Sequence, residues 1–249
     1  MRREEIVRLY DDEYATSYDD KFLLSPLAKS DSNLELELLR GFLKPGVTWL
    51  DVACGTGYFL QHFPHVKRAG LDLSASMLRL ARHRNPGVPI IEHDFRDPLP
   101  QWHDCWGLVS CMWYAYALGD SIRDALRLIE NLVAWTTPEG SCFVPLADPS
   151  MIAGVNLPCQ APSAWAGKVM IDGIVWSYVE DDGRKVHSHL ITPSIEFMVK
   201  QFQSYFEKVS VIQYPPAHEG WERRSAVVAA RKLAAFCSMP SPSGEPGTS

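Results

Sequence analysis

Short apolar runs and longer amphipathic stretches follow one another along most of the chain. The apolar runs are bounded by glycine, proline or polar residues, as buried strands are, and the stretches between them repeat apolar residues at helical spacing. The predicted strands are residues 48–54, 68–73, 88–94, 106–113, 140–147, 208–214 and 224–232. The predicted helices are residues 57–63, 74–84, 121–136 and 193–206, and Ser74 is expected to cap the second of them. Strands that alternate with helices predict an α/β fold around a parallel sheet.

Residues 148–193 interrupt this alternation. The segment begins with a loop rich in proline and alanine and continues as two strand-like runs around "EDDGR" at 180–184, a pattern that predicts a β-hairpin. We expect it to be an insertion after the fifth strand that covers a substrate. The chain is thereby divided into an N-terminal segment (1–44), a main domain (45–236) and a tail (237–249) whose small polar and turn-forming residues predict disorder.

A glycine-rich turn, "CGTGYF", follows the first predicted strand. Turns of this kind bind phosphates, dinucleotides or nucleosides. A dinucleotide fold requires GxGxxG, but after Gly55 and Gly57 the third position is Leu60. A phosphate-binding loop requires a lysine and a hydroxyl residue where Tyr58 and Phe59 stand. Both of these ligand classes are therefore excluded.

Acidic residues near the ends of the first three strands point to another ligand. Asp51, Asp72 and Asp94 meet at one edge of the predicted sheet, because the carboxyl ends of parallel strands lie together. Asp72 stands 15 residues after Gly57 and is placed to bind two ribose hydroxyls. Asp94 is followed by Phe95, a pair suited to an adenine amino group and an adenine ring face. Three acids without a phosphate-binding lysine indicate a cationic nucleoside.

Four segments, "LDVACGTGYF", "GLDLS", "EHDF" and "VSCMW", stand in register with these strands. They resemble, in that order, four segments of the class I S-adenosylmethionine-dependent methyltransferases of small-molecule type. These are the first motif, the motif that binds the ribose, the motif that binds the adenine, and the segment that follows the fourth strand. The resemblance covers about residues 45–147 and extends more loosely to residue 232. It implies a Rossmann-like seven-stranded sheet with a reversed last strand, and S-adenosyl-L-methionine as the cofactor. The cofactor-binding residues that it implies are Tyr14, Tyr18, Asp51, Ala53, Gly55, Gly57, Asp72, Leu73, Met77, Asp94, Phe95, Cys111 and Met112.

The same resemblance implies individual roles. Gly55 and Gly57 would pass close to the methionine part of the cofactor, and Asp51 would order their turn. The main chain of Cys111 would accept a hydrogen bond from the α-amino group, and Leu73 would help to hold the ribose and adenine.

The N-terminal segment repeats an aromatic residue every four positions: Tyr10, Tyr14, Tyr18 and Phe22. In a helix these residues share one face. The segment resembles the "YD..A..YD" helical lid of many small-molecule methyltransferases. Two interpretations stay open: Tyr14 or Tyr18 closes over the methionine end and excludes water, or the stripe packs on the core.

Methyl transfer needs alignment of the two reactants more than a dedicated catalytic triad. A hydroxyl or ammonium acceptor must also lose a proton to a base, and His187 and His189 in "KVHSHLIT" are the candidates. Two positions apart on a strand, they are expected to face the same side. A structural role stays open for both, and we expect no metal site because further ligands are lacking. Residues suited to a pocket wall or to the core are Trp113, Tyr114, Tyr116, Trp165, Trp176 and Tyr178.

Composition narrows the function classes. A net charge of −6 argues against binding to nucleic acid or anionic lipid, and no apolar run is long enough to span a bilayer. The charged start lacks a signal-peptide pattern, so we expect a cytoplasmic protein. The six cysteines form no CxxC pair and are expected to be reduced core thiols. The oligomeric state is not indicated.

Two motifs of other methyltransferases are rejected. "PCQ" at 158–160 matches the nucleophile motif of cytosine-C5 methyltransferases, but it follows the fifth predicted strand instead of the fourth. Residues 111–114, "CMWY", lack the Asn or Asp, two prolines and aromatic residue of enzymes that methylate adenine or glutamine nitrogens. We therefore expect a methyltransferase that acts on oxygen or nitrogen of a small molecule, such as a sugar or secondary metabolite. The alternative is a non-catalytic protein that binds S-adenosylmethionine as a sensor or partner subunit.

Overall fold

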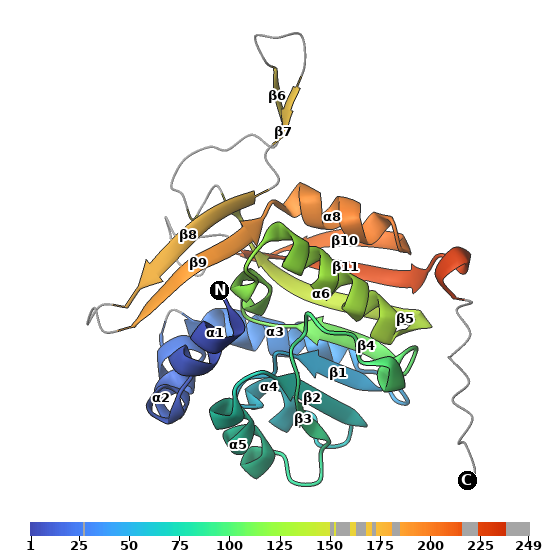
Figure 1. Ribbon diagram of the computed structural model, residues 1–249. Coiled ribbons are helices and arrows are strands. Elements are labelled where there is room, and N and C mark those ends of the chain that lie inside the picture. Colours follow the sequence, from blue (N-terminus) through green and yellow to red (C-terminus); the bar gives the residue numbers. More distant parts are fainter. Residues whose placement is uncertain are drawn as a thin grey trace, which may run out of the picture.

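A seven-stranded sheet forms the centre of the computed structural model (Figure 1). Its strands, in the spatial order β10-β11-β5-β4-β1-β2-β3, are β1 (Trp49–Val52), β2 (Arg68–Asp72), β3 (Ile90–Glu92), β4 (Trp106–Cys111), β5 (Thr136–Ala147), β10 (Phe206–Gln213) and β11 (Arg224–Lys232). Strand β11 runs antiparallel to both β5 and β10, whereas the pairs from β5 to β3 are parallel. The predicted Rossmann-like sheet with a reversed last strand is confirmed.

The structure describes residues 1–26, 28–149, 152, 160–162, 168–170, 173–180, 185–215 and 224–237, with only the backbone described for 160–162 and 168–170. Several predictions fall outside these residues: the "PCQ" motif, Trp165, the hairpin turn at 181–184 and the disorder of the tail after residue 237. The domain boundaries stay predictions.

Helices cover both faces of the sheet, and each face has its own apolar cluster. Helices α6 (Ile122–Trp135) and α8 (Ile195–Gln203) contribute Leu128, Leu132 and Phe202 to the cluster on one face. On the other face lie α3 (Ala28–Phe42), α4 (Tyr58–Gln61) and α5 (Ala75–Arg84), with Leu39 and Leu78 buried. Each of these helices therefore packs apolar residues against the sheet.

Local signals explain where helix α5 begins and ends. The Ser74 hydroxyl accepts a hydrogen bond from the Met77 backbone N–H at 3.2 Å, which confirms the predicted cap. The helix ends at Arg84, two residues before Pro86. This cap places Asp72 directly before the helix, at the end of β2.

The N-terminal segment and the insertion lie on the same side of the molecule (Figure 1). Helices α1 (Arg3–Leu9) and α2 (Asp12–Phe22) are followed by α3, and strands β8 (Gly173–Val179) and β9 (Val186–Pro193) form the predicted antiparallel hairpin. A second pair, β6 (Gln160–Pro162) and β7 (Lys168–Met170), was not predicted. Short 3-10 helices are η1 (Pro100–Trp102), η2 (Ala115–Leu118) and η3 (Ala234–Phe236).

Several element lengths differ from the prediction. Strand β3 is shorter than predicted, and β5 begins four residues earlier because it starts directly after α6, with Pro138 inside it. The predicted helix at 57–63 retains only the four residues of α4. Contacts with neighbouring elements, rather than the apolarity of the segment itself, determine where these elements begin and end.

The structure bears on two predictions made from composition, the state of the cysteines and the lack of a membrane-spanning segment. Cys54, Cys111 and Cys142 are unpaired and buried, but Cys105 is exposed, so the prediction of core thiols is wrong for that residue. None of the helices in the described part of the chain has the length and apolarity needed to cross a membrane.

Candidate active site

A cavity of about 810 Å³, its open mouth included, lies where β1, β2, β3 and β4 end. Its floor and walls come from the residues that follow these strands, including the glycine-rich turn. Four residues of the N-terminal segment, Ile6, Tyr10, Tyr18 and Leu23, close it from the other side. A ligand here is therefore held between the sheet edge and the N-terminal helices.

The glycine-rich turn has a backbone that few side chains allow. Gly55 and Gly57 both adopt left-handed φ angles, +54° and +72°, and Ala53 before them has φ +55°. A Cβ at Gly57 would lie 2.6 Å from the Asn85 side chain, whereas one at Gly55 would meet nothing within 4 Å. Gly57 is thus needed for packing on α5, and Gly55 borders the cavity.

Asp72 links the glycine-rich turn to the start of α5. Its carboxylate accepts hydrogen bonds from the backbone N–H groups of Gly55 (2.9 Å) and Ser74 (2.8 Å). Burial raises the pKa of Asp72, and these backbone hydrogen bonds oppose the shift. The side chain lines the cavity with acceptor capacity remaining, which suits a ligand with neighbouring hydroxyls.

Asp51 is held by the neighbouring strand rather than by the turn. Its carboxylate accepts a hydrogen bond from the Ser110 hydroxyl at 2.7 Å, and Ser110 in turn accepts one from the Trp49 indole N–H at 2.9 Å. Burial raises the pKa of Asp51 to about 7, although the Ser110 hydrogen bond opposes the shift. Asp51 also lines the cavity.

The carboxylate of Asp94 is occupied by two arginines. Arg96 donates to it from Nε (2.8 Å) and Nη2 (2.6 Å), and Nε of Arg3 in α1 lies 2.7 Å away. Burial alone would raise the pKa of Asp94, but the hydrogen bonds from Arg96 and the charges of both arginines lower it. Phe95 beside it is buried and lines the cavity.

These features fit S-adenosylmethionine. Asp72 offers acceptors for ribose hydroxyls, Phe95 offers an apolar face for adenine, and Asp51 supplies a carboxylate farther along the cavity. Arg96 is the arginine among the described lining residues, and its charge is already paired with that of Asp94. The charge that remains to face a ligand comes from the other acidic groups, so the cavity favours a cationic ligand.

Known proteins match this chain in sequence. Residues 50–140 match a family model described as a methyltransferase domain. The dTDP-4-amino-2,3,4,6-tetradeoxy-D-glucose N,N-dimethyltransferase of Saccharopolyspora spinosa is 32% identical over 158 residues, which cover 62% of this chain and 55% of that protein. The dTDP-3-amino-3,6-dideoxy-alpha-D-glucopyranose N,N-dimethyltransferase of Streptomyces fradiae is 36% identical over 113 residues, 43% of this chain and 42% of that protein. The chain thus spans about half the length of these curated relatives.

Solved structures match the fold. The glycopeptide N-methyltransferase MtfA complexed with S-adenosyl-L-homocysteine is similar with a TM-score of 0.60, over 79% of this chain and 88% of that chain, at 14% identity. Residues 50–140 are therefore similar to a methyltransferase domain, and the chain shares the fold of a methyltransferase of known structure.

The cavity brings together most of the predicted cofactor residues. Those that line it are Tyr18, Asp51, Ala53, Gly55, Asp72, Leu73, Met77, Asp94, Phe95 and Met112. Tyr14, Gly57 and Cys111 are not among the lining residues: Gly57 packs on α5, and the Cys111 side chain is buried in the core. Their cofactor contacts stay predictions.

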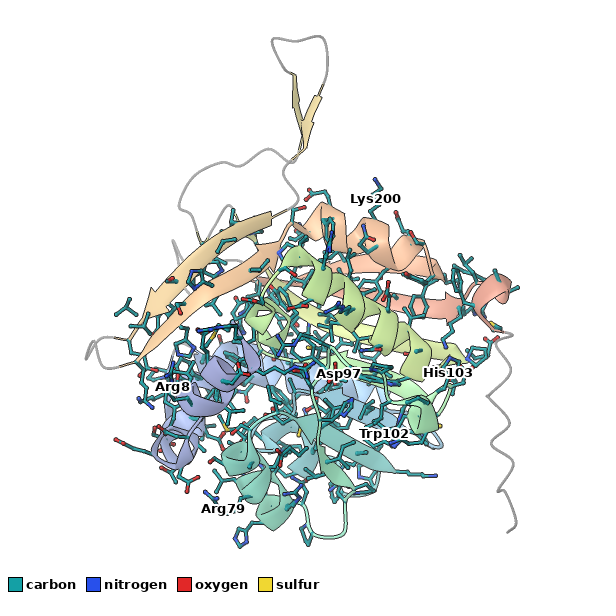
Figure 2. The ribbon with its side chains drawn as sticks, in the orientation of Figure 1. Arg8, Arg79, Asp97, Trp102, His103 and Lys200 are labelled. Carbon is teal, nitrogen blue, oxygen red and sulfur yellow. The ribbon has the colours of Figure 1, made fainter. Side chains whose placement is uncertain are left out.

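Helix α2 is attached to the rest of the structure at the glycine-rich turn. The Asp19 carboxylate accepts a hydrogen bond from Thr56 Oγ1 at 2.6 Å and pairs with Arg84 Nη1 at 2.6 Å. Arg79, labelled beside α5 in Figure 2, pairs with Asp12 at the start of α2, also at 2.6 Å. This part of the N-terminal segment is therefore helical and contacts the glycine-rich turn, and its role as a lid over the cofactor stays a prediction.

Tyr14 and His187 join α2 to the hairpin. The Tyr14 hydroxyl lies 2.8 Å from His187 Nε2, which is also 3.4 Å from Glu180 Oε1. Burial lowers the pKa of His187, although Glu180 opposes the shift. Neither Tyr14 nor His187 lines the cavity, whereas Tyr10 and Tyr18 do, and a role for Tyr14 or Tyr18 in closing over the cofactor stays a prediction.

The prediction that His187 and His189 face the same side is wrong. The β8–β9 pairing shifts register between Trp176 and Tyr178, and His189 has φ +57°, so the alternation of the strand is broken. His187 is buried and His189 is exposed. Their role as a base stays a prediction, and neither lines the cavity.

Of the aromatic residues predicted to form a pocket wall or to lie in the core, some line the cavity and others are buried in the core. Trp113 lines the cavity, whereas Tyr116 is buried with its hydroxyl accepting from the Ala147 backbone N–H at 2.9 Å. Sequence reasoning missed Thr56 and Arg96 as lining residues. Their signals were their places inside the "GTG" and "DFR" segments, next to residues already chosen.

Proposed function

We propose that this protein transfers a methyl group from S-adenosylmethionine to the amino group of a small, sugar-like metabolite. The observation that carries the proposal is the acidic cavity between the strand ends and the N-terminal helices. The names of the two relatives, both N,N-dimethyltransferases of dTDP-amino sugars, support nitrogen as the acceptor atom. When bound, S-adenosylmethionine supplies an electrophilic methyl group on a sulfonium centre.

In this proposal the chain's own residues orient the cofactor. Asp72 accepts the ribose hydroxyls while its backbone hydrogen bonds hold it in place. Phe95 packs on the adenine ring. Asp51, next to the glycine-rich turn, offers its carboxylate to the α-ammonium group.

The N-terminal aromatics would complete the acceptor side. Tyr10 and Tyr18 line the cavity, and burial raises the pKa of both phenols above their ordinary range, so they stay neutral. A neutral phenol accepts a hydrogen bond from an amine and adds no charge beside the sulfonium. Closure by these rings also excludes water, which protects the electrophile.

The test offers paired acceptors to the purified protein. A set of nucleotide-linked amino sugars, each matched with its hydroxyl counterpart, is incubated with S-adenosylmethionine, and S-adenosylhomocysteine release and product mass are measured. We expect methylated products from at least one amino sugar and none from its hydroxyl counterpart. Asp72→Ala is the variant expected to lose this activity.

The other outcomes are equally informative. Transfer only to hydroxyl or carboxyl groups would contradict the nitrogen assignment. Binding of S-adenosylhomocysteine in calorimetry without transfer to any acceptor would favour the non-catalytic alternative. No binding at millimolar ligand would reject both.

A further inference from the structure

Two successive residues after β4 have a strained backbone. Trp113 and Tyr114 have φ +50° and +56°, although neither is glycine. Such conformations persist only where the surrounding structure holds them, and they gather at functional sites. Trp113 lines the cavity, so the strained turn forms part of its wall.

Arg224, the first residue of β11, holds this turn. Its guanidinium carbon lies 4.1 Å from the Trp113 ring centroid and 4.4 Å from the Tyr114 ring centroid. Its Nε also donates a hydrogen bond to the Tyr114 hydroxyl at 2.8 Å. A planar guanidinium stacks on aromatic rings and donates in its own plane, which a lysine cannot reproduce.

Two carboxylates of α3 hold Arg224 in turn. Its Nη1 lies 3.4 Å from Asp31 Oδ2 and 3.9 Å from Glu35 Oε1, and the Glu35 side chain is fully buried. Tyr214 donates a long hydrogen bond, 3.5 Å, to Glu35. Helix α3 and strand β11 thus meet next to the part of the cavity wall that Trp113 forms, called the Trp113 wall below.

Unpaired polar atoms gather in this cluster. Trp113 Nε1 and Glu35 Oε2 are buried and have no hydrogen-bond partner among the described residues, and Arg224 Nη1 has only its two ion-pair contacts. Buried polar atoms without partners are rare, so two on residues that both lie against Arg224 indicate a site that is not built for stability alone.

The cluster lies toward the Asp51 end of the cavity. Trp113 follows β4, whose last residue, Cys111, pairs with Val52, the residue next to Asp51. Asp94 and Phe95, the adenine candidates, are contributed by the loop after β3, on the other side of β1 and β2. The Trp113 wall therefore borders the methionine end, where the acceptor must approach.

We infer that Arg224 is a positioning residue that holds Trp113 in its strained conformation and thereby sets the wall against which the amine acceptor lies. This inference rests on the proposed function for the identity of the acceptor. Asp31 and Glu35 act through Arg224 by holding its guanidinium.

The test compares Arg224→Lys with Arg231→Lys, the same change at an exposed position of β11. For Arg224→Lys we expect at least a tenfold loss of kcat/KM for the acceptor, with the affinity for S-adenosylhomocysteine kept within about twofold. The indole N–H resonance of Trp113, assigned by its loss in Trp113→Phe, should shift in Arg224→Lys and stay in place in Arg231→Lys. Tyr114→Phe, which removes the hydroxyl that accepts from Arg224 and keeps the ring and the arginine, should shift the same resonance.

Two results would overturn the inference: a Trp113 resonance that stays unmoved in both Arg224→Lys and Tyr114→Phe, or equal losses of cofactor affinity and acceptor kinetics. A wild-type protein that methylates no amine would contradict the proposed function alone. In that case the Trp113 resonance, which requires no acceptor, still decides the role of Arg224.

Discussion

Asp72 is the single residue on which the geometry of the cofactor site most depends. It ends β2, accepts backbone hydrogen bonds from the glycine-rich turn and from the start of α5, and lines the cavity. The Gly55 backbone N–H donates to Asp72 from a left-handed conformation that glycine adopts without steric strain. One carboxylate therefore both shapes the turn and faces the ligand.

Replacing Asp72 with alanine should weaken cofactor binding by about 1–3 kcal/mol, because ribose hydroxyls would be buried without an acceptor. Calorimetry with S-adenosylhomocysteine measures the change, and thermal unfolding without ligand checks that the variant is folded. Glu207→Gln, at an exposed position of β10, serves as the control. Unchanged affinity in Asp72→Ala would mean that the ribose lies elsewhere.

Helix α2 connects three parts of the structure that are far apart along the chain. Asp19 binds the glycine-rich turn and Arg84, whereas Tyr14 and Lys21 contact His187 and Glu180 of the hairpin region. An element that lies over a cavity and buries few of its side chains, here Tyr14 and Ala15, opens more readily than a core helix. We expect α2 to control the exchange of ligand.

Asp19→Asn should loosen α2, because it removes the charge that pairs with Arg84 and weakens the acceptor for Thr56. Hydrogen exchange over residues 12–22 should quicken, and the dissociation rate of S-adenosylhomocysteine should rise severalfold. Asp20→Asn, the same change at the exposed neighbouring position, should leave both rates as in the wild type. Equal rates in the two variants would show that this contact does not hold the helix.

Buried acids connect the stability of the whole molecule to pH. Glu35 and Asp51 are almost fully buried, and burial raises the pKa of Glu35 to about 8 and that of Asp51 to about 7. The folded state therefore keeps protons that the unfolded state has released. Stability is lost as the pH rises from the unfolded values near 4 toward these folded values.

Glu35→Gln should flatten this dependence, since an amide does not titrate. Between pH 5 and pH 8 the wild type should lose unfolding free energy relative to the variant, on the order of 1 kcal/mol per pH unit. Urea denaturation across this range measures the difference, with Glu37→Gln, exposed on the same helix, expected to follow the wild type. Parallel curves for Glu35→Gln and the wild type would place the titrating group elsewhere.

Much of the fold follows from local patterns in the sequence. The apolar runs predicted each strand of the central sheet, and the Ser74 cap and the strand-end acids were placed correctly before any tertiary contact was known. Periodicity and capping depend on residues a few positions apart, so they can be seen along the chain. The reversed last strand came from the family resemblance, because pairing order is not a local property.

Contacts between distant residues required the folded chain. His187 meets Tyr14 across 173 positions, and a bulge at His189 undid the expected alternation. Asp94 stood in the predicted place, yet its carboxylate is taken by Arg96 and by Arg3 from α1. Which side chains face a cavity depends on how packed elements approach one another, and that is a property of the whole structure rather than of any one segment.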